Sequence, residues 1–506
     1  MSTGTLLPQA RAVFTYPTGA PLAAGYVYTY VPGGTTPKTT YKDAACTIAN
    51  TNPIVLDAAG SCLLYGSGNF QITVTDGFGN AIPGYSGVTS DALTAIAAAT
   101  VMGPFLQSST TAGGLSQINY LSALSGASAR TVQSKLSDTV SLADFGAVGT
   151  GNATVDTAAL NAALAALPSA GGAIFIPPGS YNFSSQITYT MPSSTATITL
   201  FGAGSGVTTL TWASGGGISF TCAGAYNCFH IRGMSFFTGL AGGGTTGLAI
   251  TQTTADASPA YTPMSDLNDV AFRGSDTWGG TYYWGTAINI TGLSNVVFYN
   301  VNICGYAGSY ATLGTGVKIS GTSTTPPVVF NFNNCAINLV GTGIVYGNYV
   351  QAICLNQTNI TGVNYGVYAA TSESALDQLV LTGSQINAAT AGINAISFIP
   401  SVTVTASTFI IPNASSIGIQ LNNPGLTAIT GNSFQGGSIT GTYGVALIGT
   451  SQGAAVISGN SFNLLATGIS IGASVTLVNV QSNCYNGVTT HVVNSGSGNT
   501  IGGGST

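Results

Sequence analysis

The second half of the chain repeats one short pattern of polar and apolar positions. In most repeats a pair of Asn, Ser or Thr residues precedes one Ile, Phe or Tyr, and short runs of alternating apolar and polar residues flank it. The large apolar residue recurs at Phe236, Phe272, Ile303, Ile337, Ile360, Ile386, Phe409, Phe434, Phe462 and Tyr485. The intervals are 36, 31, 34, 23, 26, 23, 25, 28 and 23 residues. A period of this length with two-residue alternation predicts an all-β fold, a β-solenoid in which each coil buries one side of its strands.

A helical pattern precedes the solenoid. Residues 156–167 carry apolar side chains at helical spacing, and Thr154 or Asp156 is positioned to cap the helix. Its apolar face consists of Ala159, Leu160, Ala163, Leu164 and Leu167. A strand and a turn follow at 173–179. Because a solenoid exposes its core at the first coil, we predict that this helix caps roughly a dozen coils.

The N-terminal part has a different character. Residues 25–30 and 72–75 alternate as strands do, and Asp76-Gly77 is a hairpin-type turn signal. The chain is therefore divided into a β domain at 1–90, a helical and Gly/Ser-rich connector at 91–140, a solenoid cap at 141–172 and the solenoid at 173–506. A short helical stripe in the connector, which begins at Leu93, fits packing against copies of itself or against its own β domain.

The content of charged residues is the most unusual feature of the composition. Of 506 residues only 8 are basic and 13 are acidic, so that charged residues make up 4% of the chain, where soluble proteins average about 25%. Ser, Thr, Asn and Gly must supply the solubility. With a net charge of −5, the chain lacks the cations that neutralise phosphates, and nucleic acid is not a predicted partner.

Membrane insertion, metals and cofactors are not predicted either. No run reaches the roughly 18 apolar residues that span a bilayer. The first residues lack the basic and apolar regions of a secretory leader, so we expect synthesis in a cytoplasm. Eight dispersed cysteines without a C-x-x-C pair, and only two histidines, argue against zinc.

One segment of the long coils combines aromatic and charged residues. It contains Asp266, Asp269, Arg273, Asp276, Trp278, Tyr282, Tyr283 and Trp284, with two of the chain's three tryptophans. Aromatic rings pack on the CH faces of sugars, and carboxylates accept hydrogen bonds from hydroxyl groups. A carbohydrate site is therefore one hypothesis, with Arg273 and the four aromatic residues as the substrate-binding groups. Contacts between subunits are the alternative, because Tyr and Trp are also enriched at interfaces.

Carboxyl groups that could act in catalysis are scarce. Glycoside hydrolysis needs two of them, about 5 Å apart for retention or about 6.5–9.5 Å apart for inversion. Glu373, the only Glu of the chain, and Asp377 are one candidate pair, although in a regular strand they would lie about 13 Å apart. Asp266, Asp269 and Asp276 are the rival set, and stacked coils could bring one acid from each set together. The alternative for all five acids is a structural role, either as a solvated turn residue or as an Asn-like member of a ladder.

Lyase chemistry is the less favoured reaction. A pectate-lyase-type site needs an acidic cluster for Ca²⁺ and a basic residue that abstracts a proton. Apart from histidine, the solenoid offers only Arg232, Arg273 and Lys318 as basic residues. His230, two residues from Arg232, fits a hydrogen-bonded structural residue better than a catalytic base.

Two passages resemble known families. One passage resembles the opening of the pectate-lyase-like right-handed parallel β-helix superfamily, which is common in bacteriophage tailspikes; it comprises residues 141–149, 156–159 and 171–181. The preceding residues 129–138 are similar to the connector that leads into this opening. Residues 14–30, 52–57 and 68–70 resemble the virion-anchoring domain of phage tail fibres and tailspikes. Family members often have Gly-Asp-Gly and Asp-Asp-Thr where this chain has Gly149-Thr-Gly151 and Val155-Asp-Thr157, which puts a local turn in doubt.

The resemblance implies a homotrimeric appendage of the virion tail, made in the cytoplasm of the bacterial host. Its N-terminal domain would attach to phage tail or adaptor proteins, and its β-helix would bind bacterial surface polysaccharide. Hydrolysis of that polysaccharide by a glycoside hydrolase mechanism stays open. The alternative is a non-enzymatic structural or adhesive tail fibre whose tip carries a separate receptor-binding partner.

Overall fold

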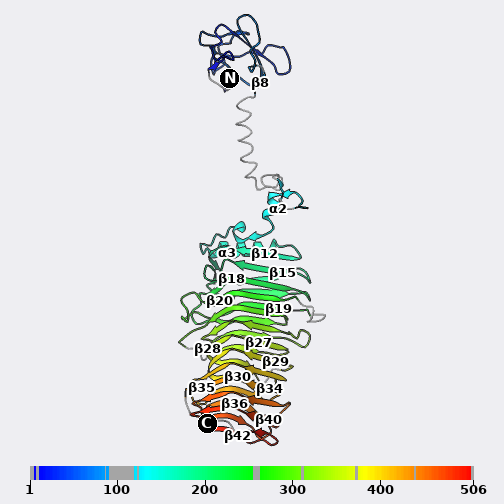
Figure 1. Ribbon diagram of the computed structural model, residues 1–506, viewed down its shortest axis with the longest axis vertical. Coiled ribbons are helices and arrows are strands. Elements are labelled where there is room, and N and C mark those ends of the chain that lie inside the picture. The colour runs from blue at the N-terminus through cyan, green and yellow to red at the C-terminus, as the bar shows by residue number, and fades with distance from the viewer. Residues whose placement is uncertain are drawn as a thin grey trace. The chain divides into compact units, whose positions relative to one another are not determined.

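A computed structural model describes residues 5–6, 11–85, 87–89, 119–121, 125–254, 263–308, 313–370, 374–437 and 440–502. The chain divides into two compact units, Met1–Asp138 and Thr139–Thr506, which Figure 1 shows and which are described separately below. The helix expected to begin at Leu93 lies outside the described residues.

The N-terminal unit consists of short, mostly antiparallel strands around a small core. Its strands are β1 (Thr5–Leu6), β2 (Ala12–Val13), β3 (Tyr26–Tyr30), β4 (Ile54–Val55), β5 (Ser61–Cys62), β6 (Tyr65–Gly66), β7 (Phe70–Thr75), β8 (Gly87–Thr89), β9 (Asn119–Tyr120) and β10 (Arg130–Thr131), followed by helix α2 (Val132–Leu136). The largest sheet has the order β4-β3-β7-β8. Alternation along β3 buries Val27, which packs with Phe14, Leu22 and Phe70.

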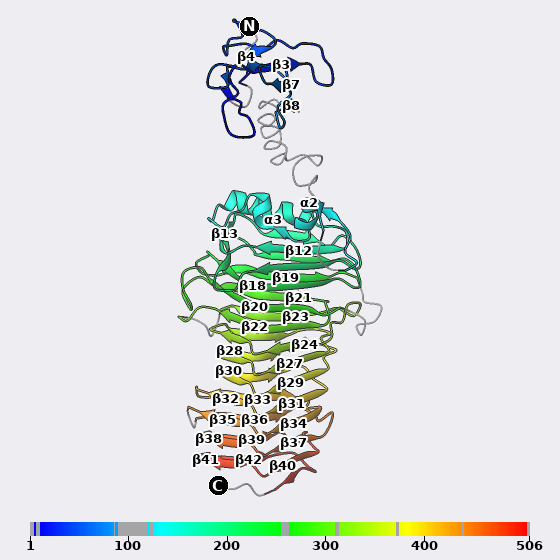
Figure 2. The same ribbon diagram turned by 45° about the horizontal axis from the view of Figure 1, so that its top comes forward.

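The second unit is a parallel β-solenoid of about 12 turns. Figures 1 and 2 show its strands stacked along one axis. A complete coil contributes strands to three faces, which we call the first, second and third face in chain order. The short strand β11 (Val140–Ser141) precedes the coils and pairs with the first of them.

The bounds of the strands follow. The first face contains β12 (Gly171–Ile176), β15 (Thr197–Gly202), the first parts of β18 (Cys228–Thr238), β20 (Ser265–Gly274) and β22 (Val296–Cys304), then β24 (Phe330–Asn333), β27 (Ala352–Asn356), β29 (Gln378–Thr382), β31 (Ser401–Thr405), β34 (Leu426–Thr430), β37 (Ala455–Ser458), β40 (Val478–Gln481) and β43 (Thr500–Ile501). The second face contains β13 (Gly179–Phe183), β16 (Thr208–Trp212), the second parts of β18, β20 and β22, then β25 (Ala336–Asn338), the first parts of β28 (Asn359–Ala369) and β30 (Gln385–Ala395), β32 (Thr408–Ile411), β35 (Ser433–Gly436), β38 (Ser461–Asn463) and β41 (Cys484–Asn486). The third face contains β14 (Ile187–Thr190), β17 (Ile218–Cys222), β19 (Gly244–Gln252), β21 (Trp284–Thr291), β23 (Thr315–Ser320), β26 (Thr342–Tyr346), the second parts of β28 and β30, then β33 (Ile417–Asn422), β36 (Tyr443–Ile448), β39 (Thr467–Ile471) and β42 (Thr490–Asn494).

The repeated large apolar residue stacks in register along the second face. The ten positions from Phe236 to Tyr485 form nine consecutive pairs, each between one coil and the next. The rings of Phe434 and Phe462 stack with their centres 4.7 Å apart. The prediction of a parallel solenoid from this spacing is therefore confirmed, because one residue per coil occupies one inward position.

The polar residues of the repeat form a second internal column at the corner between the first and second faces. Asn432 Nδ2 donates to Asn460 Oδ1, and Asn460 Nδ2 donates to Asn483 Oδ1, each at 3.0 Å. The backbone N–H groups of Asn432 and Asn460 donate to the same two oxygens at 2.9 Å. Buried backbone groups at a turn need such partners, which explains why Asn, Ser or Thr recurs there.

Glycines on the third face make room for the apolar column. Gly392, Gly418, Gly444 and Gly468 occupy equivalent inward positions. A Cβ atom on Gly444 would lie 2.5 Å from two ring carbons of Phe462 and 2.6 Å from the carbonyl oxygen of Gly468. The aromatic residue of each coil thus fits only because the facing position has no side chain.

Helix α3 (Ala153–Ala165) lies across the end of the solenoid at which the coils begin (Figure 2). Its buried residues, including Leu160 and Leu164, join the core of the first coils. The helix is capped by Asn152, whose side chain accepts a hydrogen bond from the Val155 N–H, so the prediction of Thr154 or Asp156 as the cap was wrong. Asp156 lies inside the helix, where its Oδ2 accepts a 2.8 Å bond from the Asn182 N–H of β13.

We expect Gly444→Ala to destabilise the solenoid by about 1–3 kcal/mol, because overpacking a close-fitting core forces neighbouring atoms apart. Thermal unfolding followed by calorimetry measures the effect. Gly206→Ala is the matched control, since a methyl group there meets no described atom within 4 Å. Equal melting temperatures for the two variants would contradict the packing argument.

Candidate functional site

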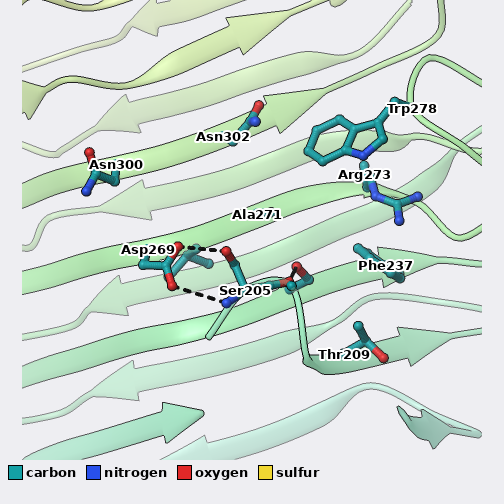
Figure 3. A pocket seen from close by; sticks show the side chains of 12 residues that line it. Ser205, Thr209, Phe237, Asp269, Ala271, Arg273, Trp278, Asn300 and Asn302 are labelled. Carbon is teal, nitrogen blue, oxygen red and sulfur yellow. Dashed lines mark hydrogen bonds between the residues drawn. The ribbon is translucent and has the colours of Figure 1, made fainter. Parts of the chain in front are cut away.

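Four consecutive coils align outward-facing residues on the second face. Thr209 of β16 lies beside Ser235 of β18, Ser235 beside Ala271 of β20, and Ala271 beside Asn302 of β22. Because the alternate residues of these strands point into the core, this row points outward and lines a groove of about 440 Å³, although Ser235 and Ala271 are themselves buried. Figure 3 shows this site, which we call the second-face groove.

Arg273 lies at one side of the groove with two aromatic residues (Figure 3). Its guanidinium carbon is 4.0 Å from the centre of the Phe237 ring and 5.0 Å from that of Trp278. Phe237 is the register partner of Arg273 on β18, whereas Trp278 comes from the loop after β20. Burial lowers the pKa of Arg273, yet a guanidinium remains charged at neutral pH. Trp278 is 53% exposed, so its indole offers an apolar surface next to a fixed cation.

Asp269 lies at the opposite side of the groove and occupies the corner between the first and second faces. Its φ is +53°, and Gly233 and Asn300 take the same left-handed conformation in the coils before and after it, a conformation that Asp and Asn tolerate. Asp269 Oδ1 accepts a 2.6 Å bond from Ser205 Oγ, and Oδ2 accepts a 3.1 Å bond from the Ser205 N–H (Figure 3). Asn300 and Asn302 add amide groups to the lining.

Asp276 holds the loop that carries Trp278. Its Oδ2 accepts hydrogen bonds from the Tyr282 N–H at 3.2 Å and from Thr281 Oγ1 at 3.3 Å. Neither Asp276 nor the half-buried Tyr282 is among the residues that line the groove. Their place in the structure fits positioning of the loop.

Tyr283 and Trp284 are buried, with 5% and 3% of their surface exposed. Tyr283 Oη donates to the carbonyl of Gly242 at 2.7 Å, and Trp284 Nε1 donates to the carbonyl of Phe236 at 3.0 Å. These two residues, which the sequence suggested as substrate contacts, are not among the residues that line the groove. Both have their polar atoms satisfied inside the solenoid, and sequence alone does not show which way the first residues of β21 point.

Asp266 lies on the first face and forms an ion-pair cluster with two residues of the preceding coil. Arg232 donates from Nε and Nη2 to its two oxygens at 2.8 and 2.6 Å, and His230 Nδ1 lies 2.5 Å from Oδ2. Burial alone would raise the pKa of Asp266, but the bonds from Arg232 and His230 outweigh it and hold that pKa at about 2. The bond to Asp266 raises the pKa of His230 to about 9. The interpretation of His230 as a hydrogen-bonded residue is confirmed, and Asp266 is a paired carboxylate outside the groove.

The remaining acids do not join this site. Glu373 lies outside the described residues. Asp377 is exposed directly before β29, which lies four coils beyond β20, or about 19 Å along the axis. The structure therefore does not bring Asp377 together with the acids of β20. Among the described residues that line the groove, Asp269 supplies the one carboxylate.

Sequence reasoning missed Ser205, Phe237 and Asn302. The repeat itself contains the signal for two of them. Aligning Phe236, Phe272 and Ile303 places Phe237 beside Arg273 and Asn302 beside Ala271. Ser205 lies in a turn between β15 and β16, where the repeat gives no register.

The fold places the chain among the parallel β-solenoids, and the groove lies on the lateral surface of this solenoid. A family model described as rhamnogalacturonase A/epimerase, pectate lyase-like, matches residues 139–394, just over half of the chain. The chain belongs to this pectate-lyase-like family.

Solved structures with a similar solenoid come from bacteria and from a phage. The A-module of the mannuronan C-5 epimerase AlgE6 of Azotobacter vinelandii is 16% identical, with a TM-score of 0.47, and the alignment covers 72% of this chain and 98% of that one. PfbA, a surface adhesin of Streptococcus pneumoniae, is 14% identical, with a TM-score of 0.46 and coverages of 70% and 93%. An N-terminal fragment of gene product 12 of bacteriophage Phi29 is 14% identical, with a TM-score of 0.48 and coverages of 70% and 72%. No curated protein sequence matches the chain.

The described residues contain no group of three or more His, Cys, Asp or Glu residues that could hold a metal ion. No helix among them has the length and apolar character needed to cross a membrane.

The ion-pair cluster predicts a pH-dependent stability. Because the pKa of His230 is about 9 in the folded protein and about 6.5 when unperturbed, its stabilising contribution is complete below about pH 6.5 and is lost as the pH rises through 9. We expect the melting temperature of wild type to exceed that of His230→Gln at pH 6, and this difference to shrink by pH 9.5. Calorimetry at both pH values checks this, and a constant difference would show that the pair is not coupled to protonation.

Proposed function

We propose that this protein binds a carbohydrate chain in the second-face groove, and that it does so as a bacteriophage tail appendage that attaches to bacterial surface polysaccharide. The observation that carries the binding proposal is the exposed indole of Trp278 beside the guanidinium of Arg273, in a groove whose remaining lining is largely polar.

The chemistry of the lining suits a sugar. A pyranose has CH-rich faces that pack on an aromatic ring and hydroxyl edges that need hydrogen-bond partners. Trp278 supplies the ring, and Asp269, Asn300 and Asn302 supply carboxylate and amide groups on the other side of the groove. Binding sites commonly combine a broad apolar contact with a few well-placed polar groups of this kind.

The shape of the groove suits an extended chain. Its floor crosses four registered coils from Thr209 to Asn302, which corresponds to about 14 Å along the solenoid axis at about 4.8 Å per strand spacing. An oligosaccharide segment, rather than a single sugar, fills a surface of this length.

The assignment to a phage tail rests on the sequence of the N-terminal half. Two features support attachment to phage tail or adaptor proteins. The first is the resemblance to virion-anchoring domains at residues 14–30, 52–57 and 68–70, and the second is the tailspike-like opening that follows at 141–181. Trimer formation belongs to the same proposal.

Antibodies against the solenoid should label the tail of the phage that encodes the chain in electron micrographs. Labelling confined to the head, or absent from the virion, would refute the assignment to a phage tail.

Trp278→Ala should weaken binding to host capsule or lipopolysaccharide by at least about tenfold, because Trp is enriched among the few residues that carry most of the binding energy. Tyr299→Ala is the matched control, since Tyr299 is 49% exposed on the first face and does not line the groove. Binding by biolayer interferometry, with melting temperatures to verify folding, measures both. Similar affinities for wild type and Trp278→Ala would contradict carbohydrate binding in the second-face groove.

An assay of new reducing ends separates binding from hydrolysis. A glycosidase needs a second carboxyl within about 10 Å of the first, and the described lining of the groove contains only that of Asp269. We therefore expect wild type to bind host polysaccharide without shortening it. If wild type does release reducing ends and Asp269→Asn or Glu373→Gln does not, hydrolysis by that carboxyl replaces simple adhesion.

A further inference from the structure

A cysteine, a histidine and an aspartate lie next to one another on the first face of the solenoid. Residues along β18 alternate in direction, so Cys228 and His230 point outward while Phe229 between them is buried in the core. The register between β18 and β20 places Asp266 directly beside His230. Alternation and register together therefore bring a thiol, an imidazole and a carboxylate into one cluster.

The three side chains form a chain of hydrogen bonds. His230 Nδ1 lies 2.5 Å from Asp266 Oδ2, and His230 Nε2 lies 4.0 Å from Cys228 Sγ. Thr197 Oγ1 of β15 lies 3.1 Å from the same sulfur. A thiol within reach of a base that a third group orients is the arrangement of an activated nucleophile, and the contact between thiol and base is often long before a reactant binds.

The ion-pair cluster keeps His230 protonated. Its hydrogen bonds to Asp266 and to Cys228 raise the pKa of His230 to about 9. The imidazole is therefore cationic at neutral pH and has an N–H group on both nitrogens. An adjacent imidazolium favours the thiolate, which is the form of cysteine that attacks disulfides.

The other charged groups near the sulfur neutralise each other. Arg232 lies on the same strand as Cys228 and donates two hydrogen bonds to Asp266, which offsets the repulsion between that carboxylate and a thiolate. On the other side, the preceding strand β15 places the neutral Thr197 beside Cys228. Among the described residues, His230 is thus the charged group in hydrogen-bond contact with the sulfur.

Side chains of the first face, and not the core, enclose Cys228. The residue is 4% exposed, but it does not belong to the core cluster that contains Cys222. The groups in hydrogen-bond contact with its sulfur are Thr197 and the partly exposed His230. A small reagent reaches the sulfur from the surface when these side chains move aside.

We propose that Cys228, His230 and Asp266 form a reactive-thiol site, at which Cys228 forms mixed disulfides with low-molecular-weight disulfides. The Cys228 thiolate attacks one sulfur of the disulfide, so that a new S–S bond forms and the original S–S bond breaks. The leaving thiolate takes a proton from water, and the disulfide itself is the oxidant. The site is separate from the second-face groove and does not depend on carbohydrate binding there.

The test exposes the full, native chain to bis(2-hydroxyethyl) disulfide at pH 8 and at pH 6, and peptide mass spectrometry after an acid quench locates the adducts. Exposed Cys484 is the comparison within the same molecule. A thiol with the ordinary pKa of about 8.5 loses about 50- to 100-fold of its thiolate over this range. We expect the rate at Cys228 to fall by less than about fivefold, and therefore far less than the rate at Cys484.

Variants identify the activating group. His230→Gln should react at Cys228 at least about tenfold more slowly than wild type at pH 6, and this difference should shrink at pH 9.5, where a thiol is deprotonated without help. A purely structural role of His230 would give the same difference at both pH values. Lys318→Gln is the control, because it removes an exposed cation from the third face, and it should leave the rate unchanged.

The measurement on wild type decides the proposal without any variant, so a folding defect of His230→Gln would not obscure the result. Modification of Cys484 without modification of Cys228 would overturn the reactive-thiol site. An equally steep loss of rate at both cysteines between pH 8 and pH 6 would overturn it as well, because the imidazolium would then not assist the thiol.

Discussion

Parallel pairing of each coil with the next, in strict register, is the constraint on which the rest of the structure depends. Register brings like residues together, so that aromatic rings stack on aromatic rings and asparagines bond to asparagines. It also aligns the glycines that make room for those rings. A shift of one residue would turn every inward side chain to solvent, and no single coil could tolerate it alone.

The same register creates the second-face groove. Outward positions are aligned as strictly as inward ones, so Phe237, Arg273, Ala271 and Asn302 form one lining although they belong to three coils. The coils that contain them are the long ones, with intervals of 36, 31 and 34 residues. Their additional length includes the loop that carries Trp278, whereas the later coils, with intervals of 23–28 residues, form a plainer stack.

The sequence was informative about the fold and only partly so about the site. The spacing of Phe236 to Tyr485 predicted the solenoid because one inward position per coil must be large and apolar. Asp269, Arg273 and Trp278 were found together because one strand and its loop carry them. The direction of Trp284 was not predictable, since it begins a strand whose phase depends on the neighbouring coil, and the bonds of Asp266 to His230 and Arg232 required the register between β18 and β20.

Charged residues are concentrated in the long coils of the solenoid. Hydrogen-bonded ladders and stacked rings hold the solenoid together without ionic groups, as the stretch after Lys318 shows, where Glu373 and Asp377 are the only Asp, Glu, Lys or Arg residues in the remaining sequence. By contrast, Arg232, Asp266, Asp269, Arg273 and Asp276 fall within 45 residues. The scaffold does not need these charged residues for stacking, and they are concentrated in the coils that form the groove.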